Sequence, residues 1–261
     1  KGELLENLGK GEACLAPTAV LNADNRWTQQ LIKKTTARVM RFGIDNEAEV
    51  MAGEIRYCME GVSFVLEAME TRLQVDLPLM GKVNIYNALA AAAVGFLSGC
   101  DGDQIWEGLR RETYQEGRMR KVSTANGKLI LNDTYNSNPA SLRMAIELLG
   151  GLPWERRRVA ILGDMLELGD FSRAEHEAIG SEKVRKCCDL LITYGTDARY
   201  IGEGARRAGM SSEAVFHFDN FFDFAQRAGG LLKSGDLILV KGSRGMKMEE
   251  IVSHLQKIST E

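Results

Sequence analysis

Short apolar runs alternate with amphipathic segments through the later part of the chain. The apolar runs predict buried strands, at residues 158–162, 190–194, 214–218 and 237–240. Helical periodicity lies between and after these runs, at residues 140–150, 172–187, 197–208, 220–232 and 246–258. Buried strands that alternate with helices are typical of a parallel sheet covered on both faces. The pattern therefore predicts a Rossmann-like α/β domain, with a mainly parallel sheet, over residues 113–261.

A hairpin and a further strand open this domain. Residues 120–124 and 128–131 flank Asn126-Gly127, and Asn-Gly is a strong signal for a two-residue turn. The second of these strands continues into a polar cluster, after which Pro139 opens a helix. Ligands of open α/β sheets bind at the carboxyl ends of strands, so this cluster is the first candidate for a site.

The first part of the chain mixes strands and helices in a less regular order. We expect elements at residues 3–8 (the end of a helix), 19–22, 38–44 and 50–77 (strands), and 84–98 and 103–111 (helices). Residues 113–117 have the composition of a linker. The chain opens on Lys1-Gly-Glu-Leu without an initiator Met. We therefore interpret residues 1–112 as an incomplete α/β piece of a longer protein.

Composition and charge narrow the range of functions. The 261 residues are 44% hydrophobic with a formal net charge of −3, so no global basic field is present to hold a nucleic acid. No apolar run is long enough to span a membrane, and no signal peptide is visible. The 5 Cys are scattered without a Cys-x-x-Cys pair, and the 3 His are far apart, which argues against disulfides or a zinc site. We expect a cytoplasmic monomer that acts on small molecules and neither binds nucleic acid nor inserts into a membrane.

Two common nucleotide-binding motifs are absent from the sequence. No Gly-x-x-x-x-Gly-Lys-Ser/Thr occurs, and no Gly-x-Gly-x-x-Gly follows a predicted strand. A nucleotide site in this protein is therefore either unorthodox or only partly contained in the chain.

Asn84 and Asn87 stand at the start of the Ala-rich helix. They are three residues apart, so both side chains can lie on one helix face. An amide can pair with both the donor and the acceptor edge of adenine. The alternative is that Asn84 is only the helix N-cap, and spacing alone favours that alternative.

Asp133 ends the strand that leads into the polar cluster. A carboxylate at a strand end suits the hydroxyl groups of a ribose. The alternative is an Asx-turn or a helix cap before Pro139. Because Tyr135, Asn136 and Asn138 crowd the same strand end, we favour a functional role.

Lys241-Gly-Ser-Arg244 lies between the last predicted strand and the last predicted helix. A lysine, a hydroxyl and an arginine beside a helix N-terminus form an anion site. The alternative is a tight turn with exposed charges. Since this loop shares the sheet edge of Asp133, a functional role is again favoured.

Two further candidates follow another strand. Asp164 and Glu167 could bind a cation or an amine, or could equally cap the helix that begins near Ser172. His176 lies within that predicted helix, and we interpret it as a structural, hydrogen-bonded histidine.

Three motifs resemble those of the Mur ligase family. They are Asn132-Asp-Thr-Tyr-Asn-Ser-Asn-Pro139, Ala160-Ile-Leu-Gly-Asp-Met-Leu-Glu-Leu-Gly169 and Val240-Lys-Gly-Ser-Arg244. The resemblance covers essentially the whole chain. It implies that residues 1–112 are the C-terminal part of a central ATP-binding domain and that residues 113–261 are a Rossmann-like C-terminal ligase domain. The family's first domain and the P-loop of its central domain have no counterpart here.

The resemblance also implies roles for individual residues. Those implied to hold the nucleotide are Asn84, Asn87, Arg118, Asp133, Tyr135 and Asn136. Those implied to approach the incoming substrate and the reacting phosphate are Asn138, Ser141, Lys241, Ser243 and Arg244. Arg118 and Lys241 are implied to be catalytic, as is Lys1, which aligns with a lysine that the family carbamylates to hold a second magnesium ion.

The activity implied by the resemblance is an ATP-dependent ligation that also uses Mg²⁺. A peptide carboxylate is phosphorylated to an acyl phosphate, which the amine of D-alanyl-D-alanine attacks, extending a UDP-N-acetylmuramoyl-tripeptide in peptidoglycan precursor synthesis. Because the triphosphate cradle is missing, we expect the chain alone to be inactive. Two other hypotheses stay open at this point: a Rossmann-type oxidoreductase, and a non-catalytic nucleotide-binding or assembly module.

Overall fold

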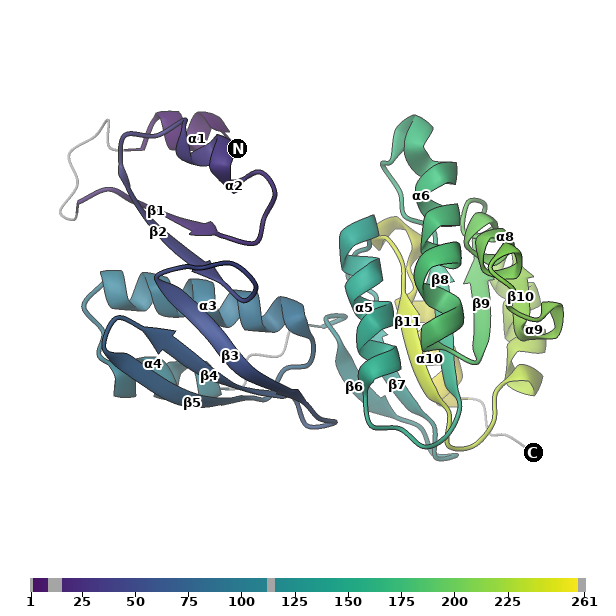
Figure 1. The fold of residues 1–261 in the computed structure, drawn as a ribbon. Coiled ribbons are helices and arrows are strands. Elements are labelled where there is room, and N and C mark those ends of the chain that lie inside the picture. Colours follow the sequence, from purple (N-terminus) through teal and green to yellow (C-terminus); the bar gives the residue numbers. More distant parts are fainter. Residues whose placement is uncertain (1, 9–15, 112–115, 258–261) are drawn as a thin grey trace. The chain divides into compact units, whose positions relative to one another are not determined.

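A computed structural model describes residues 2–8, 16–111 and 116–257 of the chain. The chain divides into two compact units, Lys1–Glu112 and Thr113–Glu261 (Figure 1). Each unit has its own sheet and its own hydrophobic core. In the described residues, no helix is both long enough and apolar enough to cross a membrane.

The first unit is built on a five-stranded sheet in the order β1-β2-β3-β4-β5. Its elements are α1 (Gly2–Glu6), β1 (Thr18–Asn22), α2 (Thr28–Ile32), β2 (Arg38–Gly43), β3 (Val50–Tyr57), β4 (Val62–Ala68), β5 (Thr71–Leu77), α3 (Lys82–Leu97) and α4 (Gly102–Arg110). The first three strands run parallel, and the last three pair antiparallel. The helix α3 covers this sheet with small and aliphatic side chains, among them Ile85, Leu89 and Ala92, which are fully buried.

The second unit is built on a six-stranded sheet in the order β10-β9-β8-β11-β7-β6. Its strands are β6 (Arg120–Ser123), β7 (Leu129–Asp133), β8 (Arg158–Gly163), β9 (Leu190–Tyr194), β10 (Val215–Phe218) and β11 (Leu237–Lys241). Its main helices are α5 (Pro139–Gly151), α6 (Ser172–Ile179), α7 (Arg185–Cys187), α8 (Arg199–Arg207), α9 (Phe221–Leu231) and α10 (Glu249–Lys257). Every strand pair is parallel except the hairpin of β6 and β7.

Helices cover both faces of this second sheet (Figure 1). The helices α9 and α10 bury one face, together with alternate strand residues such as Ile130, Ile161 and Ile238. The strand residues between them, such as Leu131 and Leu239, are also fully buried and point to the face that carries α5. Burial on both faces explains why the strands read as continuous apolar runs. The predicted parallel sheet and its opening hairpin are confirmed.

The helix predicted over 172–187 is confirmed, but its hydrogen-bonding pattern changes midway: α6 continues without a break into a π-helical turn over Gly180–Val184 and then into α7. A side chain at Gly180 would collide with the backbone carbonyl oxygen of Ile201 on α8, so the π-helical turn and α8 pack with their backbones nearly in contact. The short helix α2 was not expected, because it is too brief to show a periodic pattern.

Candidate functional site

The polar loops that follow β7, β8 and β11 meet at one edge of the second sheet, which we call the switch edge. The strand β11 lies between β8 and β7, and all three run in the same direction. The chain moves outward from β8 through β9 to β10 and then returns to insert β11 beside β7. Such a point, where the strand order reverses, is where open α/β sheets bind ligands.

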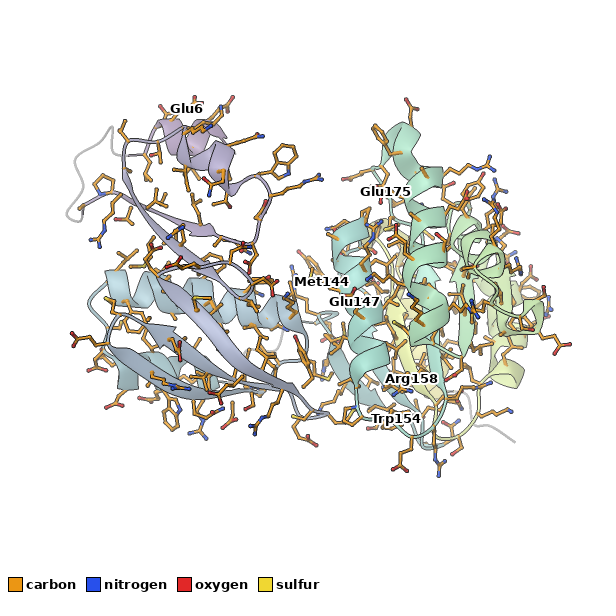
Figure 2. All side chains as sticks on the ribbon, in the orientation of Figure 1. Glu6, Met144, Glu147, Trp154, Arg158 and Glu175 are labelled. Atoms are coloured by element: carbon orange, nitrogen blue, oxygen red, sulfur yellow. The ribbon has the colours of Figure 1, made fainter. Side chains whose placement is uncertain are left out.

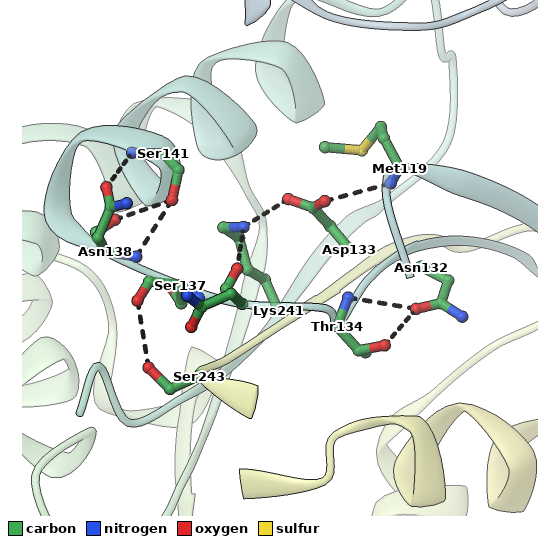
Figure 3. Close-up of polar contacts among 10 residues, drawn as sticks. Met119, Asn132, Asp133, Thr134, Ser137, Asn138, Ser141, Lys241 and Ser243 are labelled. Atoms are coloured by element: carbon green, nitrogen blue, oxygen red, sulfur yellow. Dashed lines mark hydrogen bonds and ion pairs between the residues drawn. The ribbon is translucent and has the colours of Figure 1, made fainter. Parts of the chain in front are cut away.

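Lys241 and Asp133 occupy the last positions of β11 and β7 and are register partners. Partners in register point to the same face of a sheet, so the two side chains meet. Lys241 Nζ lies 2.6 Å from Asp133 Oδ2 (Figure 3). The side chain of Lys241 is 3% exposed and that of Asp133 is 17% exposed, so this ion pair is largely removed from water.

Two further hydrogen bonds hold the pair in place. Lys241 Nζ also donates to the backbone oxygen of Asn136 at 2.8 Å. The backbone N–H of Met119 donates to Asp133 Oδ1 at 3.2 Å. An ionised carboxylate can accept about four hydrogen bonds, so Asp133 keeps acceptor capacity for a ligand hydroxyl. Nothing in the sequence pattern pointed to the contact from Met119.

Asn138 and Ser141 define the start of α5 by bonding to each other. Asn138 Oδ1 accepts the backbone N–H of Ser141 at 2.9 Å, and Ser141 Oγ accepts the backbone N–H of Asn138 at 3.1 Å. Pro139 fills the first helical position. Asn138 is therefore the helix cap, and the alternative in which Asp133 served as that cap was wrong. The substrate-binding roles of Asn138 and Ser141 stay predictions.

Ser243 ties the three loops of the switch edge together. Its hydroxyl accepts the backbone N–H of Leu166 at 2.9 Å and donates to the backbone oxygen of Ser137 at 3.1 Å. Its own backbone N–H donates to the oxygen of Asp164 at 3.0 Å. Because Ser243 is buried, these bonds are shielded from water and fix the spacing between the loops.

Asp164 is a capping residue, but not for the helix that was predicted. Its carboxylate accepts the backbone N–H groups of Thr196, Asp197 and Ala198, which directly precede α8. Burial raises the pKa of Asp164, and the backbone hydrogen bonds oppose that rise only in part. The alternative in which Asp164 caps the helix near Ser172 was therefore wrong.

His176 has the structural role that we predicted. The side chain is fully buried, and its Nε2 accepts the backbone N–H of Met165 at 2.9 Å. Its Nδ1 then carries the proton and donates to the backbone oxygen of Ser172 at 2.7 Å. The ring holds the loop after β8 against α6.

Three side chains form an exposed rim beside the buried pair. The guanidinium carbon of Arg118 lies 4.2 Å from the centre of the Tyr135 ring, and that of Arg244 lies 6.0 Å from it. Tyr135 is 40% exposed. The structure thus brings together three residues that are distant in the sequence.

Asn84 and Asn87 lie on one face of the first turns of α3, as predicted. Asn84 Nδ2 donates to the backbone oxygen of Met80 at 2.8 Å, and Asn87 Nδ2 donates to Asn84 Oδ1 at 3.3 Å. The N-cap of α3 is Gly81, with a φ of 94°, and not Asn84, so that alternative was wrong. Asn87 is exposed and Asn84 is half-buried.

Asp24 fastens the start of α3 to the sheet of the first unit, a role that was not predicted from the sequence. Its carboxylate accepts the backbone N–H groups of Ile44 and Asn46 and the hydroxyl of Tyr86, which lies on α3. Burial by itself raises the pKa of Asp24, but these hydrogen bonds outweigh burial and lower the pKa to about 2. The turn-forming sequence around Asp24 was the signal that could have revealed this role.

The proposed metal ligand cannot be placed. Lys1 lies outside the described residues. In the ranges 2–8, 16–111 and 116–257, no three His, Cys, Asp or Glu side chains gather closely enough to hold a metal ion.

Two family models match the chain. The Mur ligase middle domain matches residues 1–95, and the glutamate ligase domain of Mur ligases matches residues 117–244.

Curated relatives and solved structures point in the same direction. The chain is 33% identical, over 82% of its length, to UDP-N-acetylmuramoyl-tripeptide–D-alanyl-D-alanine ligase of Bacillus subtilis, and 32% identical, over 100% of its length, to that of Escherichia coli. It covers 46% and 55% of these two proteins, so it spans about half the length of the curated relatives that it matches. A crystal structure of MurF from Acinetobacter baumannii aligns with a TM-score of 0.83 at 26% identity, over 93% of this chain and 52% of that one.

Proposed function

The chain belongs to the Mur ligase family, and we propose that it forms the later part of the ATP-binding region and the amine-binding domain of a ligase. The proposed reaction joins D-alanyl-D-alanine to a UDP-N-acetylmuramoyl-tripeptide at the expense of ATP, in the cytoplasmic synthesis of peptidoglycan precursors. The relatives carry this reaction in their names. Because the chain spans about half of their length, the activity is proposed for the full-length gene product.

One observation carries this proposal: the buried Lys241–Asp133 pair at the switch edge. An ion pair taken out of water is costly and contributes little net stability compared with an apolar core. A polar arrangement at the ligand-binding edge of the sheet, where core packing would serve stability better, indicates a functional requirement. The four motif residues Asp133, Asn136, Lys241 and Ser243 meet there.

In this proposal Asp133 receives the ribose of the nucleotide. Lys241 and the Met119 N–H hold the carboxylate in one orientation, and the remaining lone pairs accept ribose hydroxyls. In the first unit, the exposed amide of Asn87 and its partner Asn84 offer a donor and an acceptor to the adenine.

The reacting groups carry negative charge, which the chain's own cations would neutralise. Arg118 and Arg244 stand at the exposed rim, and guanidinium groups bind phosphoryl and carboxylate oxygens through two parallel hydrogen bonds. Magnesium supplies charge neutralisation in phosphoryl transfer. The described residues present no ligand set that fits it, so none of them is assigned to it.

The decisive test is release of inorganic phosphate by the full-length gene product. We expect release only when ATP, Mg²⁺, the UDP-linked tripeptide and D-alanyl-D-alanine are all present, with formation of the extended peptide. Phosphate release that does not depend on D-alanyl-D-alanine would overturn the proposed ligation. No turnover with the complete mixture would also overturn it and would leave the non-catalytic nucleotide-binding module.

The role of Asp133 is tested with ribose analogues. The wild type should use ATP better than 2′,3′-dideoxy-ATP, and Asp133→Asn should lose about 10-fold of that discrimination, because a hydrogen bond to a charged group contributes roughly 1.5–3 kcal/mol. Asp76→Asn is the control, because Asp76 is exposed on β5 in the other unit. If Asp133→Asn keeps the full preference for the ribose hydroxyls, the carboxylate is not the ribose ligand.

A further inference from the structure

The Tyr135 ring is the meeting point of two cationic side chains that come from different segments. Arg118 lies just before β6, and Arg244 lies just after β11. Their guanidinium carbons are 4.2 Å and 6.0 Å from the ring centre, which is the distance range of cation–π contacts.

The segment that carries Arg118 is tied to the end of β7 on both sides of the arginine. The backbone N–H of Tyr135 donates to the oxygen of Gly117 at 2.9 Å, and the backbone N–H of Met119 donates to Asp133 at 3.2 Å. Gly117 has a φ of 69°, and a Cβ there would lie 2.9 Å from the Tyr135 nitrogen. The backbone therefore delivers Arg118 to the ring, and the glycine permits the close approach.

The two arginines leave an excess of positive charge at this rim. In the described part of the chain Arg118 forms no ion pair, and the contact of Arg244 with Glu249 is long, at 3.6 Å. Lys241, three residues before Arg244 in the chain, is already paired with Asp133. Two guanidinium groups repel each other, so negative charge is needed to hold both near one ring. The electron-rich ring face supplies part of this charge, and a bound oxyanion would supply the rest.

We propose that Tyr135 is a positioning residue whose ring holds Arg118 and Arg244 together as a clamp for an oxyanion. The oxyanion would be a phosphoryl group of the nucleotide or the carboxylate of the incoming dipeptide. The choice of these two ligands rests on the proposed function, whereas the clamp itself does not. The ring face acts, and not the phenol hydroxyl, which makes no hydrogen bond with any described residue. The structure offers a matched comparison in Tyr200 on α8, whose ring also lies near two guanidinium groups, at 4.8 Å from Arg173 and 4.9 Å from Arg199.

The clamp is tested on this chain by titration with inorganic pyrophosphate, followed by calorimetry and by the NMR shifts of the arginine Nε–H groups. Tyr135→Phe should bind as the wild type does, and Tyr135→Leu should bind about three- to tenfold more weakly, the range expected when exposed cation–π contacts are lost. Arg244→Gln should weaken binding at least as much. Tyr200→Leu, the matched control, should leave the affinity unchanged.

Three results would overturn the clamp. They are equal affinity of Tyr135→Leu and the wild type, equal loss in Tyr135→Phe and Tyr135→Leu, and equal loss in Tyr200→Leu and Tyr135→Leu. Unfolding midpoints of the variants show whether a loss of affinity reflects a loss of fold. Tyr135 is 40% exposed, so we expect these midpoints to stay close to that of the wild type.

The source of the oxyanion is identified with the full-length gene product. A rise in KM for ATP in Tyr135→Leu, with KM for D-alanyl-D-alanine unchanged, assigns the clamp to a phosphoryl group, and the reverse assigns it to the dipeptide carboxylate. If kcat falls while both KM values stay constant, the clamp does not hold either substrate and the inference fails. Failure of the ligation assay itself would overturn the proposed function but not the binding of pyrophosphate.

Discussion

Two buried lysines lie at opposite ends of the neighbouring strands β7 and β11, and they differ in whether they pair with a carboxylate. At the switch edge, Lys241 is 3% exposed and pairs with Asp133. At the other end, Lys128 is 2% exposed, and its Nζ has no hydrogen-bond partner in the described residues. The nearby acid there is Asp236, but Arg157 already holds it through two hydrogen bonds, at 3.0 and 2.7 Å.

This difference distinguishes two kinds of buried lysine. At the switch edge the lysine is part of a polar site whose groups bind one another, whereas at the other end the lysine lacks a partner in the described residues. Each end of the strand pair has one lysine and one aspartate, and competition for the carboxylate decides which lysine is satisfied. Trp154 and Arg158 lie at the Lys128 end of this unit (Figure 2), where Trp154 Nε1 donates to the oxygen of Gly235. This contact ties the segment before β8 to the segment before β11.

The largest expected effect comes from removing the satisfied lysine. Lys241→Met leaves the Asp133 carboxylate in a largely buried position without its cation, which should lower the free energy of unfolding by roughly 3–5 kcal/mol. Urea unfolding of the chain, followed by circular dichroism, measures the change. A loss below about 1 kcal/mol would show that the pair is solvated and that the contrast between the two ends is false.

The same substitution at the other end should act in the opposite direction. Lys128→Met removes a charged group that burial penalises, so the free energy of unfolding should rise by about 1 kcal/mol. Burial lowers the pKa of Lys128, and the charge of Asp236 offsets this in part. Because the folded-state pKa lies below the ordinary value of 10.5, protonation opposes folding, and stability should rise as the pH is raised toward 10.5.

A comparison of the wild type with Lys128→Met tests whether Lys128 is the source of this pH dependence. The wild type should gain stability between neutral and alkaline pH, and Lys128→Met should lack that part of the gain. In an Arg157→Leu background, Asp236 becomes available to Lys128, and Lys128→Met should no longer be stabilising. A double-mutant cycle in which the two changes simply add would contradict the competition for Asp236.

The smallest effect concerns the helix that starts at the switch edge. Asn138→Ala removes half of the capping box of α5 and should cost about 1 kcal/mol of stability. Asn220→Ala is a matched control, because Asn220 caps α9 through the same type of bond, to the backbone N–H of Asp223. Both variants should lose similar stability, but only Asn138→Ala should weaken turnover by the full-length protein. If the two variants retain equal turnover, Asn138 serves only as the cap of α5 and has no role in substrate binding.

Much of the fold and of the site could be predicted because it depends on local patterns. Continuous apolar runs indicated the parallel sheet, and the polar residues at the ends of two predicted strands indicated that Asp133, Ser243 and Lys241 would share one edge. The partners could not be predicted. Lys128 and Lys241 look alike in the sequence, and only the register of β11 against β7 and the reach of Arg157 decide which one finds a carboxylate.

Residues that act through their backbone or through long-range contacts were also beyond the sequence. The N–H of Met119 reaches Asp133 only because the segment before β6 folds back on the end of β7. Asp24 lies 62 residues from Tyr86 in the chain, so no local pattern linked it to α3. Asn84 was mistaken for a possible cap because Gly81, with its positive φ, begins the helix three residues earlier.

The central claim is that the switch edge, and not the opposite end of the same strands, serves the chemistry. The direct measurement is kcat/KM for ATP in D-alanyl-D-alanine-dependent phosphate release by full-length Asp133→Asn and Asp236→Asn, assayed well below both unfolding midpoints. We expect Asp133→Asn to lose about 10- to 100-fold, as removal of a charged hydrogen-bond partner predicts, and Asp236→Asn to stay within about twofold of the wild type. Equal losses in the two variants would contradict the account.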